Sequence, residues 1–213
     1  MKKLSGLYAI TNEKLMPEKN FLSLAEAAIS SGISVLQYRD KSSDHKKRCQ
    51  QAEALKELCD EYQVIFIIND DIDLATHVDA DGIHIGKNDL SLFDTRKQLG
   101  ADKIIGVSCY NQLTLAEEAV SSGADYIAFG SFFGSTIKPD APQANIDLIT
   151  QFKNNFKTPV CCIGGITSKN APLLFDAGTD MIAVISSIFS QPSSNKIAHA
   201  CKILNNLKRD TEQ

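Results

Sequence analysis

The sequence PVCCIGGITSKNAPLLFDAGTDMIAVISS, residues 159–187, decides the fold. Two short apolar runs, PVCCIGG (159–165) and DMIAVIS (180–186), enclose segment 166–178, whose apolar residues recur at helical spacing. Gly178 follows this segment, as glycine commonly does just beyond the end of a helix. The stretch therefore predicts a strand, a helix and a second strand, which is the unit from which parallel sheets are built.

The same alternation extends over the rest of the chain. Six further runs rich in Ile and Val predict strands: GLYAIT (6–11), ISVLQYR (33–39), VIFIIN (64–69), DGIHIG (81–86), KIIGVS (103–108) and DYIAFGS (125–131). Helical periodicity marks the segments between and after them, including 21–32, 42–62, 112–123 and 193–209. Gly32, Gly100 and Gly123 each follow a helical segment and precede a strand.

Eight strand–helix units in 213 residues predict an α/β fold, a closed (β/α)8 (TIM) barrel that occupies residues 1–213 as a single domain. An open doubly wound sheet is the alternative architecture. It is disfavoured because no GxGxxG fingerprint follows the first strand.

Composition restricts the partners and the compartment. A net charge of −4 and a pI near 5.6 argue against a general nucleic-acid binder. The first apolar run is too short for a signal peptide, and no run of eighteen apolar residues predicts a membrane span. The six cysteines form no CxxC pair, so we expect mostly buried thiols in a reducing cytoplasm.

Polar residues collect where strands end, and in a barrel these ends form the active face. Gln37, Arg39 and Lys41 alternate at the end of the second strand, so their side chains share one face. Two cations and an amide at one place suit a diphosphate, since arginine offers forked donors and lysine a point charge. The alternative is a solvated basic loop.

Acidic residues follow the next two strands. Asn69, Asp70 and Asp71 come directly after the third strand, with Asp73 close behind, and Asp89 follows the fourth. Helix capping accounts for one of these aspartates. The others predict a site for Mg²⁺, which takes few protein oxygens and completes its shell with water and phosphate.

His84 lies within the fourth strand without a second nitrogen or sulfur ligand nearby, so it predicts a hydrogen-bonding residue rather than a zinc ligand. No nucleophile–base pair is evident among the polar residues. The loop after the sixth strand, 129–139, combines hydroxyls, glycines and Lys138 and predicts a lid over an anion, with a structural hydroxyl-rich turn as the alternative. Ser108 ends the fifth strand.

A second anion site is predicted near the last strands. Gly164 and Gly165 follow the seventh strand, and Ser186 begins a helix after the eighth. Barrels commonly bind a substrate phosphate there, because glycine allows the backbone amides to approach it closely.

Taken together and in order, the motifs resemble those of the thiamine phosphate synthase family. The likeness runs from GLYAIT to AVISSI and is carried by LQYRDKSSD, IINDDIDLA, DADGIHIGKNDL, IGVSCYN, GADYIAFGSFF, IKPDAP and CIGGI. The resemblance implies a transferase that joins a hydroxymethylpyrimidine diphosphate to a thiazole phosphate and releases pyrophosphate. It implies dissociative chemistry assisted by Mg²⁺, and association into a homo-oligomer.

The resemblance also implies roles for individual residues. Contacts to the pyrimidine diphosphate would come from Gln37, Arg39, Lys41, Asn69 and Ser108. Asp70 and Asp89 would hold Mg²⁺, directly or through water, and Lys138 would neutralise the departing diphosphate. Arg39, Ser108 and Lys138 are thus the expected catalytic residues. The thiazole phosphate would be surrounded by Ser135, Thr136, Ile137, Gly165, Ile185 and Ser186.

Two alternatives compete with a synthase. A thiazole tautomerase on the same barrel would need no magnesium–diphosphate site, so the retained charged residues argue against it. A non-catalytic phosphate- or thiamine-binding protein is favoured only by Ile137, because the family's lid commonly reads Thr-x-Thr-Lys and this chain reads Ser135-Thr136-Ile137-Lys138.

Ile137→Thr tests that departure. Restoring the hydroxyl would restore a hydrogen bond, which is typically worth about 0.5–1.5 kcal/mol. We therefore expect the KM for the thiazole phosphate to fall several-fold in steady-state assays. An unchanged or higher KM would show that the hydroxyl is irrelevant in this chain.

Overall fold

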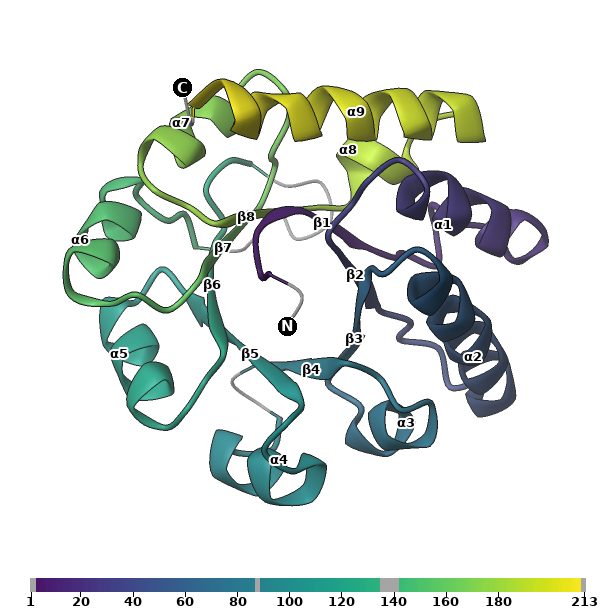
Figure 1. The fold of residues 1–213 in the computed structure, drawn as a ribbon, viewed down its shortest axis with the longest axis horizontal. Coiled ribbons are helices and arrows are strands. Elements are labelled where there is room, and N and C mark those ends of the chain that lie inside the picture. The colour runs from purple at the N-terminus through teal and green to yellow at the C-terminus, as the bar shows by residue number, and fades with distance from the viewer. Residues whose placement is uncertain (1–2, 87–88, 135–141, 212–213) are drawn as a thin grey trace.

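The computed structural model describes residues 3–86, 89–134 and 142–211. Within these residues, eight parallel strands follow one another in chain order and close into a barrel (Figure 1). The fold predicted from the alternation of apolar and helical segments is therefore confirmed. The strands are β1 (Gly6–Ile10), β2 (Val35–Tyr38), β3 (Ile65–Asn69), β4 (Gly82–Ile85), β5 (Ile104–Tyr110), β6 (Tyr126–Gly130), β7 (Val160–Ile163) and β8 (Met181–Val184).

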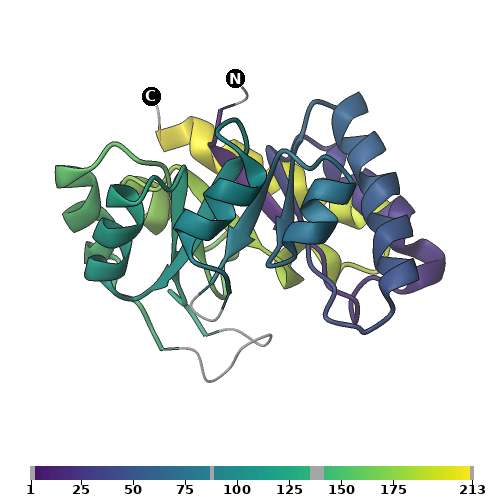
Figure 2. The same ribbon diagram turned by 90° about the horizontal axis from the view of Figure 1, so that it is seen from below.

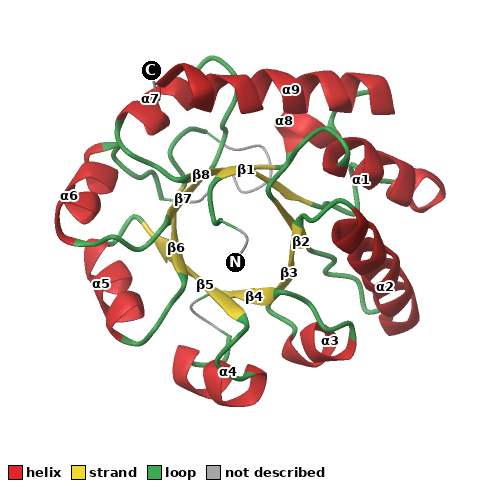
Figure 3. Cartoon of the chain, in the orientation of Figure 1, coloured by secondary structure: helices red, strands yellow, loops and turns green. Residues whose placement is uncertain are grey.

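Helices form a ring outside the strands (Figures 1 and 3). The same ribbon turned by 90° shows the helices on both sides of the strands (Figure 2). They are η1 (Glu18–Asn20), α1 (Phe21–Ile29), α2 (His45–Glu61), α3 (Ile72–His77), α4 (Leu92–Leu99), α5 (Leu113–Ser121), α6 (Asp147–Asn155), α7 (Ala171–Asp176), α8 (Ser186–Phe189) and α9 (Ser194–Thr211).

Alternation along the strands divides the core in two. Leu7, Leu36 and Phe66 belong to the larger cluster, which packs between the strands and the helices. Tyr8, Val35 and other side chains of opposite parity form a second cluster inside the barrel. The interior is thus filled by side chains, as in other barrels of this size.

Three aspartates connect the starts of neighbouring strands through hydrogen bonds. An aspartate directly precedes β4, β6 and β8, and each accepts a hydrogen bond from a backbone N–H near the start of the preceding strand. Asp81 accepts from Phe66, Asp125 from Ile105 and Asp180 from Val160, each at 2.8 Å. These carboxylates join neighbouring strands at the N-terminal end of the barrel, the end associated with stability.

The burial of the cysteines matches the expectation from the sequence. All six carry thiols, and all except Cys49 are buried. Burial raises the pKa of the Cys162 and Cys201 thiols to about 12. Over the described ranges, no helix is both long and apolar enough to cross a membrane.

Asp125→Ala tests the aspartate connections. The carboxylate accepts from the buried N–H of Ile105 and from Arg96 Nη2, at 2.8 and 2.6 Å. Its removal should lower the free energy of unfolding by about 1–3 kcal/mol, the usual cost of a buried donor left without its acceptor. Urea denaturation followed by circular dichroism measures the change. Asp176→Ala, at an exposed carboxylate on α7, is the control and should change stability by less than about 0.5 kcal/mol. Equal effects of the two variants would contradict the role of Asp125.

Candidate functional site

A cavity of about 610 Å³ lies at the barrel, and residues from the carboxyl ends of its strands line it. Several predicted site residues share this lining: Gln37, Arg39, Asn69, Ser108, Gly165, Ile185 and Ser186. They come from five different strands or the loops that follow them, so the fold brings together residues as much as 149 positions apart in the sequence. The cavity is of the size that small-molecule ligands occupy.

Hydrogen bonds fix the end of β2 against its neighbours. The Arg39 backbone N–H donates to Thr11 Oγ1 at 2.8 Å, and the Thr11 hydroxyl donates back to the Arg39 carbonyl at 3.2 Å. Gln37 is buried, with its Nε2 donating to the Tyr8 hydroxyl at 2.8 Å. These contacts orient the backbone from which the Gln37 and Arg39 side chains enter the cavity.

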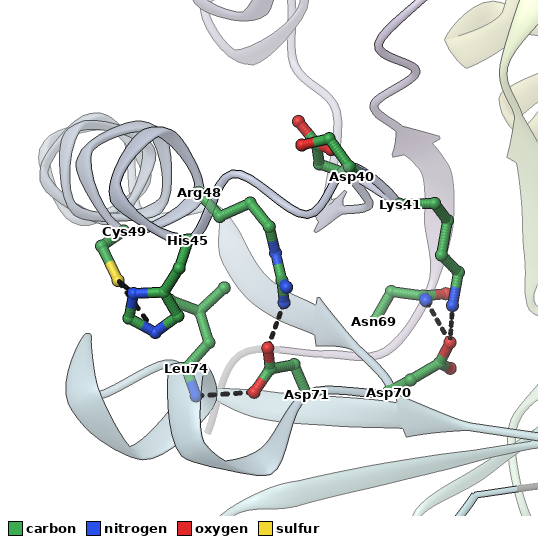
Figure 4. A network of polar contacts seen from close by, with 10 residues as sticks. Asp40, Lys41, His45, Arg48, Cys49, Asn69, Asp70, Asp71 and Leu74 are labelled. Atoms are coloured by element: carbon green, nitrogen blue, oxygen red, sulfur yellow. Dashed lines mark hydrogen bonds and ion pairs between the residues drawn. The ribbon is translucent and has the colours of Figure 1, made fainter.

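The two aspartates after β3 have different partners (Figure 4). Asp71 caps α3 by accepting from the Leu74 backbone N–H at 2.9 Å, and it also pairs with Arg48 of α2. Helix capping therefore accounts for Asp71, as the sequence allowed for one of these acids. Asp70 turns toward Lys41 and Asn69 instead, and accepts from Asn69 Nδ2 at 2.6 Å.

Lys41 differs from its expected placement beside Gln37 and Arg39. It is absent from the cavity lining and forms an ion pair with Asp70 at the edge of the site. β2 ends at Tyr38, so strand alternation no longer governs position 41. The cation nevertheless stays within the acidic region that follows β3.

Asp70 and Asp89 influence each other's ionisation. Burial opposes ionisation of Asp70, but the hydrogen bond and charge of Lys41 outweigh it and lower the pKa of this carboxyl. Burial and the nearby Asp70 charge raise the pKa of Asp89, although Asp89 accepts from the Gly86 backbone N–H at 2.6 Å. The two carboxylates form a pair of hard oxygen donors next to Asn69.

In the described part of the chain, no group of three or more His, Cys, Asp or Glu side chains could hold a metal ion. A carboxylate pair still fits Mg²⁺, which is commonly bound by one or two protein carboxylates together with water and substrate phosphate.

Backbone loops form the opposite side of the cavity. Gly165 adopts a φ of +61°, and a Cβ there would lie 2.4 Å from the Gly134 carbonyl oxygen. The loops after β6 and β7 are joined by a hydrogen bond from the Phe133 N–H to the Gly164 carbonyl at 3.0 Å. Ser187, after β8, donates to the Ile166 carbonyl. Gly165 therefore has to be glycine, because it lies where the loops after β6, β7 and β8 meet.

Tyr8 and Tyr126 line the cavity but were not predicted from the sequence. Their hydroxyls lie 2.9 Å apart inside the barrel. His84 Nδ1 lies 2.9 Å from the Tyr126 hydroxyl, and its Nε2 lies 2.8 Å from Ser108 Oγ. The expectation of a hydrogen-bonding His84 is confirmed. Residue parity along β1 and β6 could have identified both tyrosines once the inward face was known.

The Ser108–His84 contact bears on the expectation that no nucleophile–base pair is present. These residues lie on neighbouring strands, β5 and β4, and are separated by 24 positions in the sequence, so no local motif reveals them. A serine and a histidine at 2.8 Å suit a nucleophile and its base as well as they suit a structural hydrogen bond. The direction of the hydrogen bond distinguishes the two.

Four predicted residues, Ser135, Thr136, Ile137 and Lys138, lie outside the described residues. The predicted lid and its contacts with a thiazole phosphate consequently remain predictions from the sequence.

Known proteins resemble this chain in both sequence and fold. The family model described as thiamine monophosphate synthase matches residues 7–188. A thiamine-phosphate synthase of Alcanivorax borkumensis is 46% identical over 202 residues, which cover 95% of this chain and 93% of that protein. A thiamine-phosphate synthase of Acidithiobacillus ferrooxidans is 47% identical over 190 residues, 88% of each chain.

A solved structure agrees with these relatives. The thiamine phosphate pyrophosphorylase of Pyrococcus furiosus superposes with a TM-score of 0.88 at 30% identity, covering 98% of this chain and 97% of that one. The matches extend over the whole barrel rather than over one motif. The chain belongs to the thiamine monophosphate synthase family.

Proposed function

We propose that this protein is a thiamine-phosphate synthase that acts in the cytoplasm. It joins 4-amino-2-methyl-5-hydroxymethylpyrimidine diphosphate to a thiazole phosphate, forming thiamine phosphate and pyrophosphate. One observation carries the proposal beyond family membership: a single cavity has cationic and amide side chains on one side and close-packed glycine backbone on the other. Two anionic substrates can thus be held with their reacting ends together.

The wall from β2 to β5 would bind the diphosphate substrate. The Arg39 guanidinium offers forked donors, and Gln37, Asn69 and Ser108 add neutral hydrogen-bonding groups around it. In a dissociative reaction, the bond between the pyrimidine methylene carbon and the diphosphate oxygen breaks first, so negative charge accumulates on the leaving group. Donors fixed in advance stabilise that charge at little reorganisation cost.

Asp70 and Asp89 would hold Mg²⁺ beside this wall, with Asn69 close by. Their oxygen donors, partial burial and electrostatic coupling fit a hard divalent cation. Bound there, the ion would supply positive charge to the diphosphate oxygens. Lys41, which pairs with Asp70, would contact the same diphosphate.

The loops after β7 and β8 would bind the thiazole phosphate. Gly165, Ile185 and Ser186 line this part of the cavity, and backbone amides at such loops are the usual phosphate ligands of barrels. The thiazole nitrogen would then face the pyrimidine carbocation and form the new carbon–nitrogen bond. The largely apolar barrel interior beneath would limit access of water, which would otherwise capture the cation.

The direct test is thiamine phosphate formation from the two substrates. The folded protein should form product with Mg²⁺, and excess chelator should abolish it, because charge on the leaving group would no longer be neutralised. Addition of Mg²⁺ beyond the chelator should restore the rate. Absence of product at saturating substrate would favour the tautomerase or binding-protein alternatives, and chelator-resistant activity would contradict the role of Asp70 and Asp89.

Gly165→Ala tests the assignment of the phosphate side. The added Cβ would approach the Gly134 and Phe133 carbonyl oxygens at 2.4 and 2.8 Å, so the loop must shift. We expect the KM for the thiazole phosphate to rise about tenfold, corresponding to ~1.4 kcal/mol, with a smaller effect on the pyrimidine diphosphate.

Gly123→Ala is the matched control. Gly123 also has a positive φ, +92°, but a Cβ there meets no described atom within 4 Å, and the residue lies between α5 and β6 at the other end of the barrel. It should lose stability without changing either KM. Equal KM changes for the two substrates in Gly165→Ala would argue against a separate phosphate side.

A further inference from the structure

A chain of hydrogen bonds crosses the barrel interior from β2 to β5. It runs from Gln37 Nε2 to the Tyr8 hydroxyl at 2.8 Å and on to the Tyr126 hydroxyl at 2.9 Å. It continues to His84 Nδ1 at 2.9 Å, and from His84 Nε2 to Ser108 Oγ at 2.8 Å. Both ends, Gln37 and Ser108, line the cavity at positions assigned above to the pyrimidine diphosphate.

The hydrogen bond between Gln37 and Tyr8 determines which groups donate in the bonds that follow it. The Gln37 Nε2 group has only hydrogens to offer, so the Tyr8 oxygen accepts. Burial raises the pKa of both phenols far above neutral, so each tyrosine keeps its single proton. Within the described chain, the hydroxyl of Tyr8 has hydrogen bonds to Gln37 and Tyr126, and its proton therefore points to Tyr126.

The same reasoning assigns the donors and acceptors as far as Ser108. Among the described residues, the Tyr126 hydroxyl has hydrogen bonds to Tyr8 and His84. Because it accepts from Tyr8, its own proton is directed to His84 Nδ1. A ring nitrogen that accepts a hydrogen bond carries no proton, and the neutral imidazole then holds its proton on Nε2. That proton is donated to Ser108 Oγ. The serine hydroxyl therefore keeps its hydrogen for another acceptor.

We propose that this chain of hydrogen bonds fixes His84 as the Nε2–H tautomer, so that Ser108 presents its hydroxyl proton to the substrate as a hydrogen-bond donor. Tyr8, Tyr126 and His84 are then positioning residues, which act through Ser108. The inference rests on the proposed function, because its acceptor is an oxygen or ring nitrogen of the pyrimidine diphosphate. His84 cannot serve as a base for Ser108 in this state, so Ser108 is a donor rather than a nucleophile.

Ring packing holds the hydrogen-bonded side chains in place. The rings of His84 and Tyr126 stack with centroids 5.6 Å apart, and Tyr8 meets Tyr126 edge-on at 6.1 Å. Gly106 provides the space, since a Cβ there would lie 2.0 Å from Tyr126 Cζ. Tyr8, Tyr126 and Gln37 are at most 3% exposed, so water does not compete strongly for these hydrogen bonds.

The tautomer can be measured on the resting enzyme. Two-bond ¹⁵N–¹H correlation spectra of protein labelled at histidine should show His84 protonated at Nε2 and bare at Nδ1. The chain has four histidines, and His84→Gln identifies the signal by its loss. Protonation at Nδ1, with Ser108 donating to Nε2, would overturn the proposal, as would a doubly protonated ring at neutral pH.

Two tyrosine variants separate the links. Tyr126→Phe removes the donor to Nδ1, so His84 should become a mixture of tautomers. Tyr8→Phe leaves that donor in place, so His84 should keep the Nε2–H form. Tyr38→Phe is the matched control, because this buried hydroxyl on β2 contacts Gln51 instead, at 3.0 Å. It should change neither the tautomer nor the kinetics. An unchanged tautomer in Tyr126→Phe would overturn the proposal.

Kinetics complete the test. Tyr126→Phe should lower kcat roughly 3- to 10-fold, the range expected for one lost hydrogen bond, with little change in KM. In a Ser108→Ala background the same substitution should have no further effect on kcat, because the chain then has no hydroxyl to orient. Additive losses would show that Tyr126 acts independently of Ser108. Since the tautomer is read without substrate, failure of this inference is distinguishable from absence of synthase activity.

Discussion

Four parallel residue pairs, from Gly6 with Met181 to Ala9 with Val184, join β1 to β8 and close the sheet. Without this closure, β1 and β8 would be the two edges of an open sheet, and the carboxyl ends of the strands would not surround a common cavity. Tyr8 could not then meet Tyr126, because their strands are neither adjacent in the sheet nor near in sequence. The candidate site depends on the barrel being closed, and only then on individual residues.

Closure also forces polar side chains into a confined interior. Hydroxyl, amide and imidazole groups lie among apolar residues such as Val35, Ile67 and Met181. Each unsatisfied polar group there would cost roughly 1–3 kcal/mol, so a continuous chain of hydrogen bonds is the arrangement that tolerates them all. Gly106 is part of this arrangement, since the Tyr126 ring occupies the volume that a side chain at position 106 would need.

Prediction from the sequence succeeded where regular spacing determines structure. Short apolar runs alternating with helical patterns located the eight strands, and the polar residues at their ends identified part of the cavity lining. It was less successful where the strand had ended: Lys41 left the expected face because no ladder held its backbone beyond Tyr38. Tyr8 and Tyr126 were missed for a different reason, since an aromatic residue within an apolar strand has the same pattern whether it packs against helices or faces the cavity.

Aspartate illustrates how position in the barrel decides what a residue type can do. At the N-terminal end, Asp125 and its counterparts accept from backbone N–H groups of the preceding strand, and these carboxylates stabilise the fold. After β3, Asp71 repeats that structural role on a helix, while the adjacent Asp70 adopts a φ of +62° and turns toward Lys41. The left-handed backbone at Asp70 separates the two side chains. A structural cap and a candidate ligand can therefore occupy consecutive positions without competing for the same partners.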